Sequence, residues 1–328
     1  MRKLVAGFRR NDLLLLLFLA SIWGTAFTFI TIGLDRFTPF LFASLRFDIT
    51  GALLLAIAAI RRKGPLIPQT RNQWMTVITA GLLMTGAYHA FLFWGQDSTT
   101  SGIAAIIVGL SPVLTIVFTH AFLHDDRLGW RGILGVIVGL GGIIILGSLK
   151  EDQGFDAQFW GETAIVAAIT SWALGSVLVK RAKHGMEVFS FAAWQALVGA
   201  LGLHLTTFVL EGGGEIREST DGWSLTWAVA SLLYLAVISS GIGFIIYFKL
   251  VESVGPIRVN LVSYIAPVFA NIAAILILKE VLELRAIVAF ALIVTSLTLV
   301  IRTKAHPPAA SAPAPGGSES EDLRRVAP

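Results

Sequence analysis

The 328-residue sequence has no cysteine and little charge, and each absence excludes a class of protein. Without cysteine there is no disulfide framework, no thiolate metal site and no cysteine nucleophile. Only 14% of the residues are Asp, Glu, Lys or Arg, against about 25% in soluble domains. With 55% hydrophobic residues and a mean hydropathy of +0.77, the chain has more apolar surface than a soluble fold can bury. The composition argues against a soluble enzyme and favours a protein embedded in the bilayer.

The apolar residues form long continuous runs, each close to the roughly 20 residues that cross about 30 Å of hydrocarbon as a helix. Membrane strands would alternate polar and apolar residues, so the sequence predicts an all-α integral membrane protein. Ten transmembrane helices are predicted, at Asp12–Gly33, Pro39–Ile60, Trp74–Gly95, Ser101–Phe122, Trp130–Leu149, Phe159–Val179, Val188–Leu210, Leu225–Phe248, Arg258–Leu278 and Leu284–Ile301.

The two ends of the chain differ from the spans between them. Basic residues precede the first run, as in a secretory signal, but the uncharged stretch continues to Leu34. It is therefore longer than the apolar core of about 7–15 residues in a signal peptide. We expect residues 1–11 to be a cytoplasmic segment before an uncleaved first span. Residues 303–328 are rich in Pro, Ala, Gly and Ser, which predicts a disordered cytoplasmic tail.

Basic residues are divided unequally between the two sets of connecting segments. With the N-terminus inside, 19 of the 25 Lys and Arg residues lie inside and five lie outside, while Arg46 falls within a span. The excess of basic residues in cytoplasmic segments of membrane proteins then predicts a multi-pass protein of the cell (inner) membrane with both termini in the cytoplasm. Cytoplasmic flanks account for the net charge of +4, so no nucleic-acid partner is expected.

The chain is self-similar at two nearly constant offsets, which indicates an internal repeat. A shift of 149 residues places Ser21-Ile22-Trp23 on Thr170-Ser171-Trp172, and a shift of 155 places Leu110–Val113 on Ile265–Val268. Each copy holds five predicted spans, an odd number, so the second copy enters the membrane from the opposite side. The sequence thus predicts two inverted-topology repeats, over 12–149 and 159–302. Many secondary transporters hold their substrate between such repeats.

Several short motifs occur in the two repeats. They are Ala-Ser-Leu-Arg-Phe at 43–47, Tyr88–Gly95, Leu-Ser-Pro-Val at 110–113, Tyr247–Gly255, Ser-Tyr-Ile-Ala-Pro-Val at 263–268 and Leu-Lys-Glu at 278–280. This pattern resembles the EamA-type drug/metabolite transporter superfamily, whose members have two repeats of five helices. In the first repeat of this chain, His124-Asp125-Asp126 replaces the family's Gly-Glu. The resemblance covers about residues 12–302 and implies export or exchange of small metabolites, amino acids among them, without ATP.

Ionisable side chains at membrane depth cost at least about 2.5–3.5 kcal/mol, so they need protein, cavity water or a ligand as neighbours. Arg46 and Asp48 lie roughly 10–14 Å below the outer end of the second span. They are separated by about 200° around the helix and cannot share a face. Arg46 either binds a substrate carboxylate or bonds free carbonyls of a neighbouring helix. Asp48 either carries a coupling proton or is a paired structural residue. His89, at similar depth, is a candidate for substrate binding and proton relay, or is satisfied by a neighbour.

Aromatic and polar side chains near the midplane add further candidates for substrate binding. Trp23 and Trp172 are paired by the offset of 149 and are expected to line the pathway, with packing of the helices as the alternative. Asn260 and Tyr264 share one face of the ninth span. Gln195 takes the place of Arg46 in the second repeat, which makes the site chemically asymmetric. Histidines near span ends, His120 and His204, are expected to face the membrane interface.

Prolines at equivalent positions predict where the helices bend. Pro112 and Pro267 each remove a helix hydrogen bond in mid-span, and we expect them to be hinges for alternating access. The fifth and tenth spans are Gly-rich or aliphatic and are predicted to serve packing or dimer contacts, so a homodimer is left open. The sequence has no cluster of His or acidic residues at metal-binding or acid–base spacing, and no phosphate loop. We therefore expect no catalytic residue, no metal and no cofactor.

Together these patterns predict a carrier that moves a small amphipathic solute, such as an amino acid, by alternating access. Its expected partners are the solute and the lipid bilayer, with H⁺ coupling and facilitated diffusion both open. Efflux follows from the family resemblance alone. Two alternatives remain at this point. A drug or cation exporter would need a buried carboxylate as its main site charge. A non-transporting scaffold or lipid-handling protein would have a closed, apolar interface between its halves.

Overall fold

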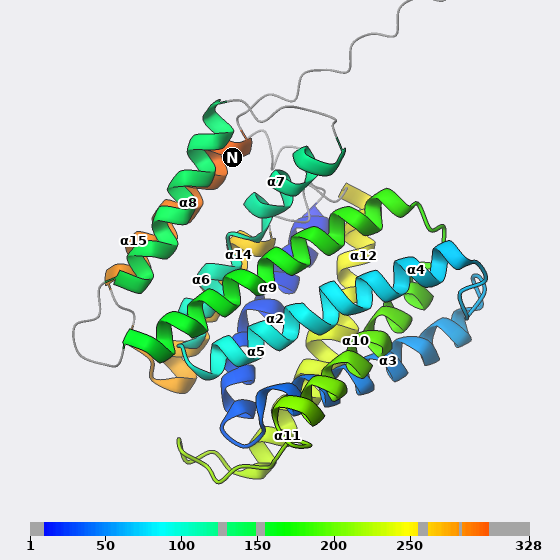
Figure 1. Cartoon of the computed structure of the whole chain (residues 1–328), viewed down its shortest axis with the longest axis horizontal. Helices are drawn as coiled ribbons and strands as arrows, with labels where there is room; N and C mark the ends of the chain where they lie inside the picture. Colours follow the sequence, from blue (N-terminus) through cyan, green and yellow to red (C-terminus); the bar gives the residue numbers. More distant parts are fainter. Residues whose placement is uncertain (1–9, 124–129, 149–154, 255–261, 282–283, 302–328) are drawn as a thin grey trace, which may run out of the picture.

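The computed structural model describes residues 10–123, 130–148, 155–254, 262–281 and 284–301, and these residues fold into a bundle of helices (Figure 1). No strand occurs among them, only an isolated antiparallel bridge between Phe37 and Ile216. The predicted all-α class is therefore confirmed for the part of the chain that the structure describes. The predicted tail at 303–328 and the His124-Asp125-Asp126 motif lie outside the described residues.

The helices follow the predicted apolar runs, with several runs divided into consecutive segments. Their bounds are α2 (Arg10–Leu34), α3 (Pro39–Arg61), α4 (Arg71–Ala80), η1 (Gly81–Ala87), α5 (Tyr88–Asp97), α6 (Ser101–Val108), α7 (Ser111–Leu123), α8 (Trp130–Ser148), α9 (Phe155–Ala182), α10 (Val188–Leu210), α11 (Leu225–Leu233), η2 (Tyr234–Ile242), α12 (Gly243–Val254), α14 (Val262–Ala273), η3 (Ala274–Leu278) and α15 (Leu284–Ile301).

Six helical segments within the described residues are long and apolar enough to cross a membrane. Shorter apolar helices cover Ser101–Thr115, Ile265–Leu278 and Leu284–Ser296. The chain is therefore a multi-pass membrane protein, while the count of ten crossings stays a prediction. The six long segments are Asn11–Leu34, Pro39–Arg61, Arg71–Asp97, Ala157–Ala182, Val188–Leu210 and Leu225–Tyr247.

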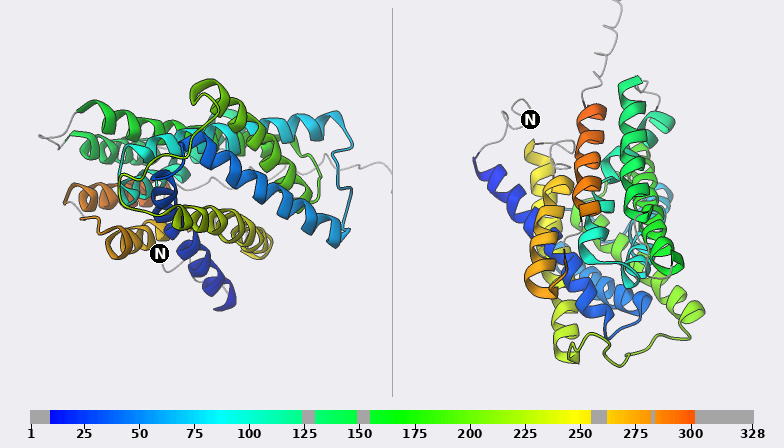
Figure 2. Two further views of the ribbon diagram at one scale, coloured as in Figure 1. Left: turned by 90° about the horizontal axis from the view of Figure 1, so that it is seen from below. Right: turned by 90° about the vertical axis from the view of Figure 1, so that its left-hand side faces the viewer.

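Helices that are far apart in sequence pack against each other throughout the bundle. α3 lies along α10, α2 lies along α14 and contacts α11 and α12, and α9 contacts α4, α5 and α7. α8 and α15 lie side by side at one edge of the bundle (Figures 1 and 2). The predicted packing role of the fifth and tenth spans therefore corresponds to a contact between these two helices.

Three segments of the bundle are π-helical, so their backbone bonds run from residue i to i+5 in a wider turn. η1 joins α4 to α5, and η2 joins α11 to α12, each without a break in the helix path. Both fall in the third predicted span of their half, and a shift of 155 residues places Gly81–Ala87 on 236–242, inside η2. The sequence analysis did not predict them. π turns are common at functional sites.

Acidic side chains connect the two halves of the chain at one end of the bundle. Glu211, just after α10, accepts hydrogen bonds from the backbone N–H groups of Phe40 and Leu41 at the start of α3. Glu280 does the same for Ser101 and Gly102 at the start of α6. Carboxylates are stabilised at these positions because the N-terminus of a helix carries partial positive charge.

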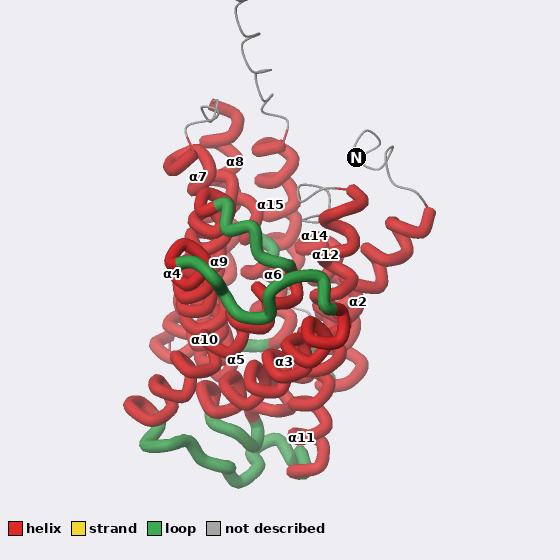
Figure 3. Tube along the Cα trace, turned by 90° about the vertical axis from the view of Figure 1, so that its right-hand side faces the viewer, coloured by secondary structure: helices red, strands yellow, loops and turns green. Residues whose placement is uncertain are grey.

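Two further acidic groups bind at that same end, which we call the carboxylate end (Asp35, Asp97, Glu211 and Glu280). Asp97 pairs with Arg217 at 3.1 Å. Asp35 accepts hydrogen bonds from the loop below α11 that Figure 3 shows as one of the long connections. Among the described residues, mostly neutral bonds join the opposite end. They run from Asn72 to the Ala182 carbonyl, Gln73 to the His184 carbonyl, Trp194 to the Leu66 carbonyl and Ser253 to Asp12.

Asp35 should make the stability of the carboxylate end depend on pH. Burial works to raise the pKa of this carboxyl group, but bonds from Ser219, Asp221 and Thr220 outweigh burial and hold the pKa below its ordinary value of 3.8. A carboxylate with a lowered pKa stabilises the fold above its ordinary pKa, and this stability is lost as the pH falls through the lower value. We expect Asp35→Asn to remove about 1–2 kcal/mol at pH 7.

The measurement is the midpoint of urea unfolding in detergent between about pH 3 and pH 7. The difference between wild type and Asp35→Asn should shrink below about pH 4. Asp221→Asn is the matched control, because only the backbone N–H of Asp221 contacts Asp35. A difference that stays constant over the whole range would contradict the prediction.

Candidate functional site

Arg46 is a buried guanidinium near the middle of α3, with only 7% of its surface exposed. Its Nε and Nη2 donate hydrogen bonds to the Ser240 hydroxyl oxygen, at 3.2 and 3.1 Å. Its Cζ lies 5.1 Å from the Phe47 ring centroid and 5.8 Å from that of Phe93. In the described part of the chain, no carboxylate forms an ion pair with Arg46. Among the described residues, this cation at membrane depth therefore has a hydroxyl and aromatic rings as its neighbours, and no opposite charge.

His89 lies beside Arg46 and shares its aromatic neighbours. The His89 ring lies 4.3 Å from Phe47 and 6.1 Å from Phe93, measured between ring centroids. Its Nδ1 is 2.9 Å from the carbonyl oxygen of Thr85 in η1. A carbonyl oxygen only accepts, so Nδ1 carries the hydrogen and Nε2 is the free acceptor of a neutral ring. The ring is 7% exposed, and its backbone bond matches the alternative that a neighbour satisfies this histidine.

The two predicted tryptophans are connected to Arg46 through different neighbours. Trp172 on α9 packs on Tyr88 at 5.2 Å between ring centroids, and Tyr88 packs on His89 at 4.6 Å. Trp23 on α2 donates its indole N–H to the Ser239 carbonyl at 3.1 Å, next to the serine that binds Arg46.

The hydrogen bond from the Trp23 indole to Ser239 is expected if Trp23 serves the packing of the helices. Gly243 makes room for the indole, because a Cβ there would lie 2.7 Å from Trp23 Nε1.

Four of the predicted substrate-binding residues, Trp23, Arg46, His89 and Trp172, thus belong to one connected group. It reaches from Trp23 through Ser239 and Ser240 to Arg46, and from Arg46 through His89 and Tyr88 to Trp172. We call this group the Arg46 cluster. It joins α2, α3 and α5 of the first half to η2 and α9 of the second. Its members are Trp23, Arg46, Phe47, Tyr88, His89, Phe93, Trp172, Ser239 and Ser240.

Asp48 points away from this cluster, as its spacing from Arg46 predicts. Its Oδ2 lies 2.7 Å from Nε2 of His204 on α10, and the two side chains are 44% and 42% exposed. The expectation that His204 faces the membrane interface is therefore incomplete, because α3 and α10 pack together and bring an acidic partner to it. The observed pair matches the structural alternative for Asp48.

The remaining candidates lie apart from Arg46 or cannot be placed. Pro112 follows a break at residues 109–110 and lies in the first turn of α7 instead of mid-helix. Such a position is one that proline tolerates. Pro267 lies inside α14, as predicted. Tyr264 lies on α14, but its side chain and the whole of Asn260 fall outside the described residues.

Two polar residues of the π segments belong to the site and were missed from the sequence. Ser240 in η2 binds Arg46, and Thr85 in η1 binds His89 through its carbonyl and Gln195 through its hydroxyl. The offset of 155 residues pairs Thr85 with Ser240. If this comparison of the two repeats had included small polar residues as well as tryptophans and prolines, it would have identified Thr85 and Ser240.

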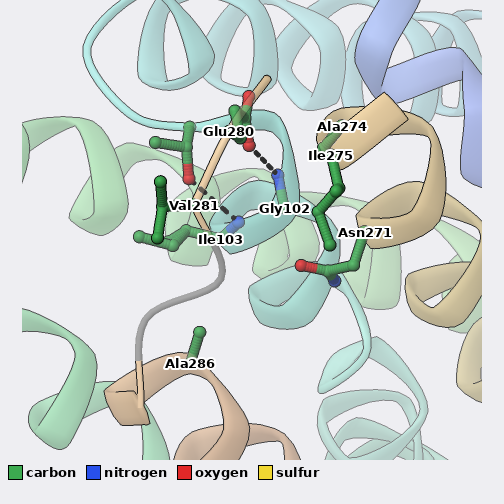
Figure 4. A pocket seen from close by; sticks show the side chains of 9 residues that line it. Gly102, Ile103, Asn271, Ala274, Ile275, Glu280, Val281 and Ala286 are labelled. Carbon is green, nitrogen blue, oxygen red and sulfur yellow. Dashed lines mark hydrogen bonds between the residues drawn. The ribbon is translucent and has the colours of Figure 1, made fainter. Parts of the chain in front are cut away.

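A small, partly open pocket lies at the carboxylate end, apart from the Arg46 cluster. Figure 4 shows Glu280 reaching the N-terminus of α6 at Gly102, with Asn271 of α14 beside it. The Glu280 carboxylate already occupies the helix N-terminus there. The pocket is therefore part of the contact between the halves.

Comparison with known proteins gives a consistent result. The model of the EamA-like transporter family matches residues 12–148 and again residues 159–302. The uncharacterized transporter YvbV of Bacillus subtilis is 27% identical over 90% of this chain and 94% of its own length. A probable amino-acid metabolite efflux pump of Salmonella typhimurium is 29% identical over 83% of this chain and 89% of its own length. A crystal structure with 24% identity covers 89% of this chain and 96% of the matched one, with a TM-score of 0.61.

Proposed function

The chain belongs to the EamA-like transporter family, and from this premise we propose that it exports a small carboxylate-bearing metabolite, such as an amino acid, by alternating access. Family membership makes it a membrane transporter rather than an enzyme, as the resemblance implied. The substrate, the direction and the mechanism are the proposal. One relative is named as a probable amino-acid metabolite efflux pump, which supports both the solute class and the direction.

The observation that carries the proposal is the buried guanidinium of Arg46. A charge at membrane depth is expensive unless it is paired or contacts a polar cavity or ligand. Ser240 and two aromatic rings surround Arg46, and within the described residues it has no carboxylate partner. A substrate carboxylate would supply the missing charge through a charge-assisted bond. The same guanidinium would repel a cation, so the site fits a cationic drug poorly.

The proposed architecture is two inverted five-helix repeats, over 12–149 and 159–302, with ten crossings in total. The helix contacts support this because they are reciprocal between the halves. α2 contacts α14, the ninth predicted span, and α9 contacts α7, in the fourth. α3 contacts η2 of the eighth span, and α10 contacts η1 of the third. Equivalent helices pair directly in α3 with α10 and in α8 with α15.

The proposed orientation places the carboxylate end outside and both termini in the cytoplasm, following the distribution of basic residues. The connection between α3 and α4 lies on the side proposed as cytoplasmic. Four basic residues lie in it or at its two ends, Arg61, Arg62, Lys63 and Arg71. Proton coupling through His89 or Asp48 stays a prediction, and so does a homodimer.

Counterflow in proteoliposomes tests the proposed function. Vesicles loaded with one amino acid are diluted into the same labelled amino acid, and uptake is compared with that of the matching amine, which lacks the carboxylate. We expect uptake of the amino acid to exceed that of the amine by at least about tenfold. Equal uptake of the two, or uptake no faster than in empty liposomes for a panel of amino acids, would overturn the proposal.

A further inference from the structure

The two π segments hold a matched pair of polar contacts, one in each half of the chain. Arg46 donates to the hydroxyl of Ser240 in η2. Gln195 Nε2 donates to the hydroxyl of Thr85 in η1 at 3.3 Å. The shift of 149 residues places Arg46 on Gln195, and the shift of 155 places Thr85 on Ser240. Both contacts therefore link the second span of one half to the π turn in the third span of the other.

The two contacts differ in charge and therefore in the ligand group that each can hold. Arg46 offers only donors. Gln195 donates one of its two amide N–H groups to Thr85, and its Oε1 is an acceptor. His89 Nδ1 donates to the Thr85 carbonyl, so Nε2 of the neutral imidazole is an acceptor too. Within the described residues, no donor is bonded to either of these atoms. The Gln195 side therefore presents hydrogen-bond acceptors, which the guanidinium of Arg46 lacks.

The His89 imidazole and the Arg46 guanidinium lie close together, and Thr85 connects His89 to Gln195. Arg46 Cζ and the His89 ring lie against the same phenyl ring, at 5.1 and 4.3 Å from the Phe47 centroid. Arg46 Cζ and the centroid of the His89 ring therefore cannot be farther apart than the sum of these two distances. Thr85, which contacts Gln195, is one hydrogen bond from His89. All four polar residues of this region are buried.

We propose that Gln195, Thr85 and His89 form a second subsite that accepts hydrogen bonds from the N–H end of the substrate while Arg46 binds its carboxylate. This inference rests on the proposed function and narrows its substrate to a zwitterion with a short carbon chain between amine and carboxylate. Polar side chains buried together in a ligand site set orientation and selectivity, because a ligand that lacks the matching group leaves them unpaired.

The test compares an amino acid with its matching 2-oxo acid, which keeps the carboxylate and the carbon chain but has no N–H group. Each is used as an inhibitor of labelled amino-acid counterflow in proteoliposomes. We expect the wild type to bind the amino acid at least about tenfold better than the 2-oxo acid. Gln195→Leu should bring this ratio close to one by weakening the amino acid alone. Gln195→Glu, which adds a negative charge beside the amine, should raise the ratio.

Two further variants separate the subsite from a general effect on packing. Gln96→Leu removes another buried amide, one that is bonded within the first half to Phe27 and Thr31, and should leave the ratio unchanged. Thr85→Val keeps the shape of the side chain without its hydroxyl and should lower the ratio, which covers the case in which Gln195→Leu fails to fold.

The outcomes distinguish this inference from the proposed function on which it rests. A ratio near one in the wild type, or a ratio that neither Gln195→Leu nor Thr85→Val alters, would overturn the second subsite while carboxylate transport stands. Loss of all carboxylate counterflow in the wild type would instead overturn the proposed function. A ratio that falls in Gln195→Leu and rises in Gln195→Glu would support the subsite.

Discussion

Arg46→Gln is expected to raise the half-saturating concentration for a carboxylate substrate by about 30-fold or more. The reason is that removing one member of a buried, hydrogen-bonded charge pair costs about 2–5 kcal/mol, and each 1.4 kcal/mol is a factor of about ten in affinity. Glutamine retains a donor for Ser240 but has no charge for the substrate carboxylate. The measurement is the concentration dependence of amino-acid counterflow in proteoliposomes.

Two variants make this result specific to the guanidinium. Arg46→Lys keeps the charge but has no planar fork to bind Ser240 and a carboxylate together, so its effect should be intermediate. Arg61→Gln removes an exposed arginine from the same helix, one whose Cζ lies over the Phe189 ring at 4.3 Å, and should leave transport unchanged. Normal substrate affinity in Arg46→Gln would contradict the assignment of this residue to the carboxylate.

Glu280→Gln is expected to lower the free energy of unfolding by about 2–4 kcal/mol, the largest stability effect we predict. The Glu280 carboxylate accepts bonds from the N–H and hydroxyl of Ser101 and from the N–H of Gly102, at 3.0, 2.9 and 3.2 Å. Bonds to a charged group contribute about 1.5–3 kcal/mol, and an anion at a helix N-terminus adds to this. The glutamine amide would place its NH₂ group against a backbone N–H.

The measurement for Glu280 is the urea unfolding midpoint in detergent, with Lys279→Gln as the neighbouring control. Lys279 is exposed and its Nζ donates only to the Leu276 carbonyl within the same segment, so its loss should change little. If both variants unfold at the wild-type midpoint, the contact between Glu280 and α6 does not stabilise the two halves against each other.

The sequence was sufficient for the class and the family, and it identified Arg46 as a charge within an apolar run. Long apolar runs predict helices because the bilayer accepts only helices and closed barrels, and barrel strands would alternate polar and apolar residues. An arginine inside such a run can also be recognised from the sequence, because placing its charge in the membrane costs free energy unless it has a polar partner. The motifs around Arg46 and Pro267 resemble the family that the comparisons then confirmed.

The partners of these side chains could not be predicted, because they depend on how the helices are rotated against each other. Nothing in the composition of 81–87 or 234–242 marks a π turn, and the wider turn changes which face each following residue presents. The pairing of Asp48 with His204 depends on the contact between α3 and α10. Both features follow from packing, which a local pattern does not encode.

The unequal bonding at the two ends of the bundle has a consequence for the transport cycle. Separating the halves at the carboxylate end must break bonds from backbone N–H groups to Glu211, Glu280 and Asp35, whereas the bonds of the described residues at the opposite end come mainly from neutral amide and indole donors. In an alternating-access cycle, these carboxylate bonds would slow opening at the end proposed to face outside. The rate of opening toward each side would then differ, while the solute gradient would still set the direction of net flux.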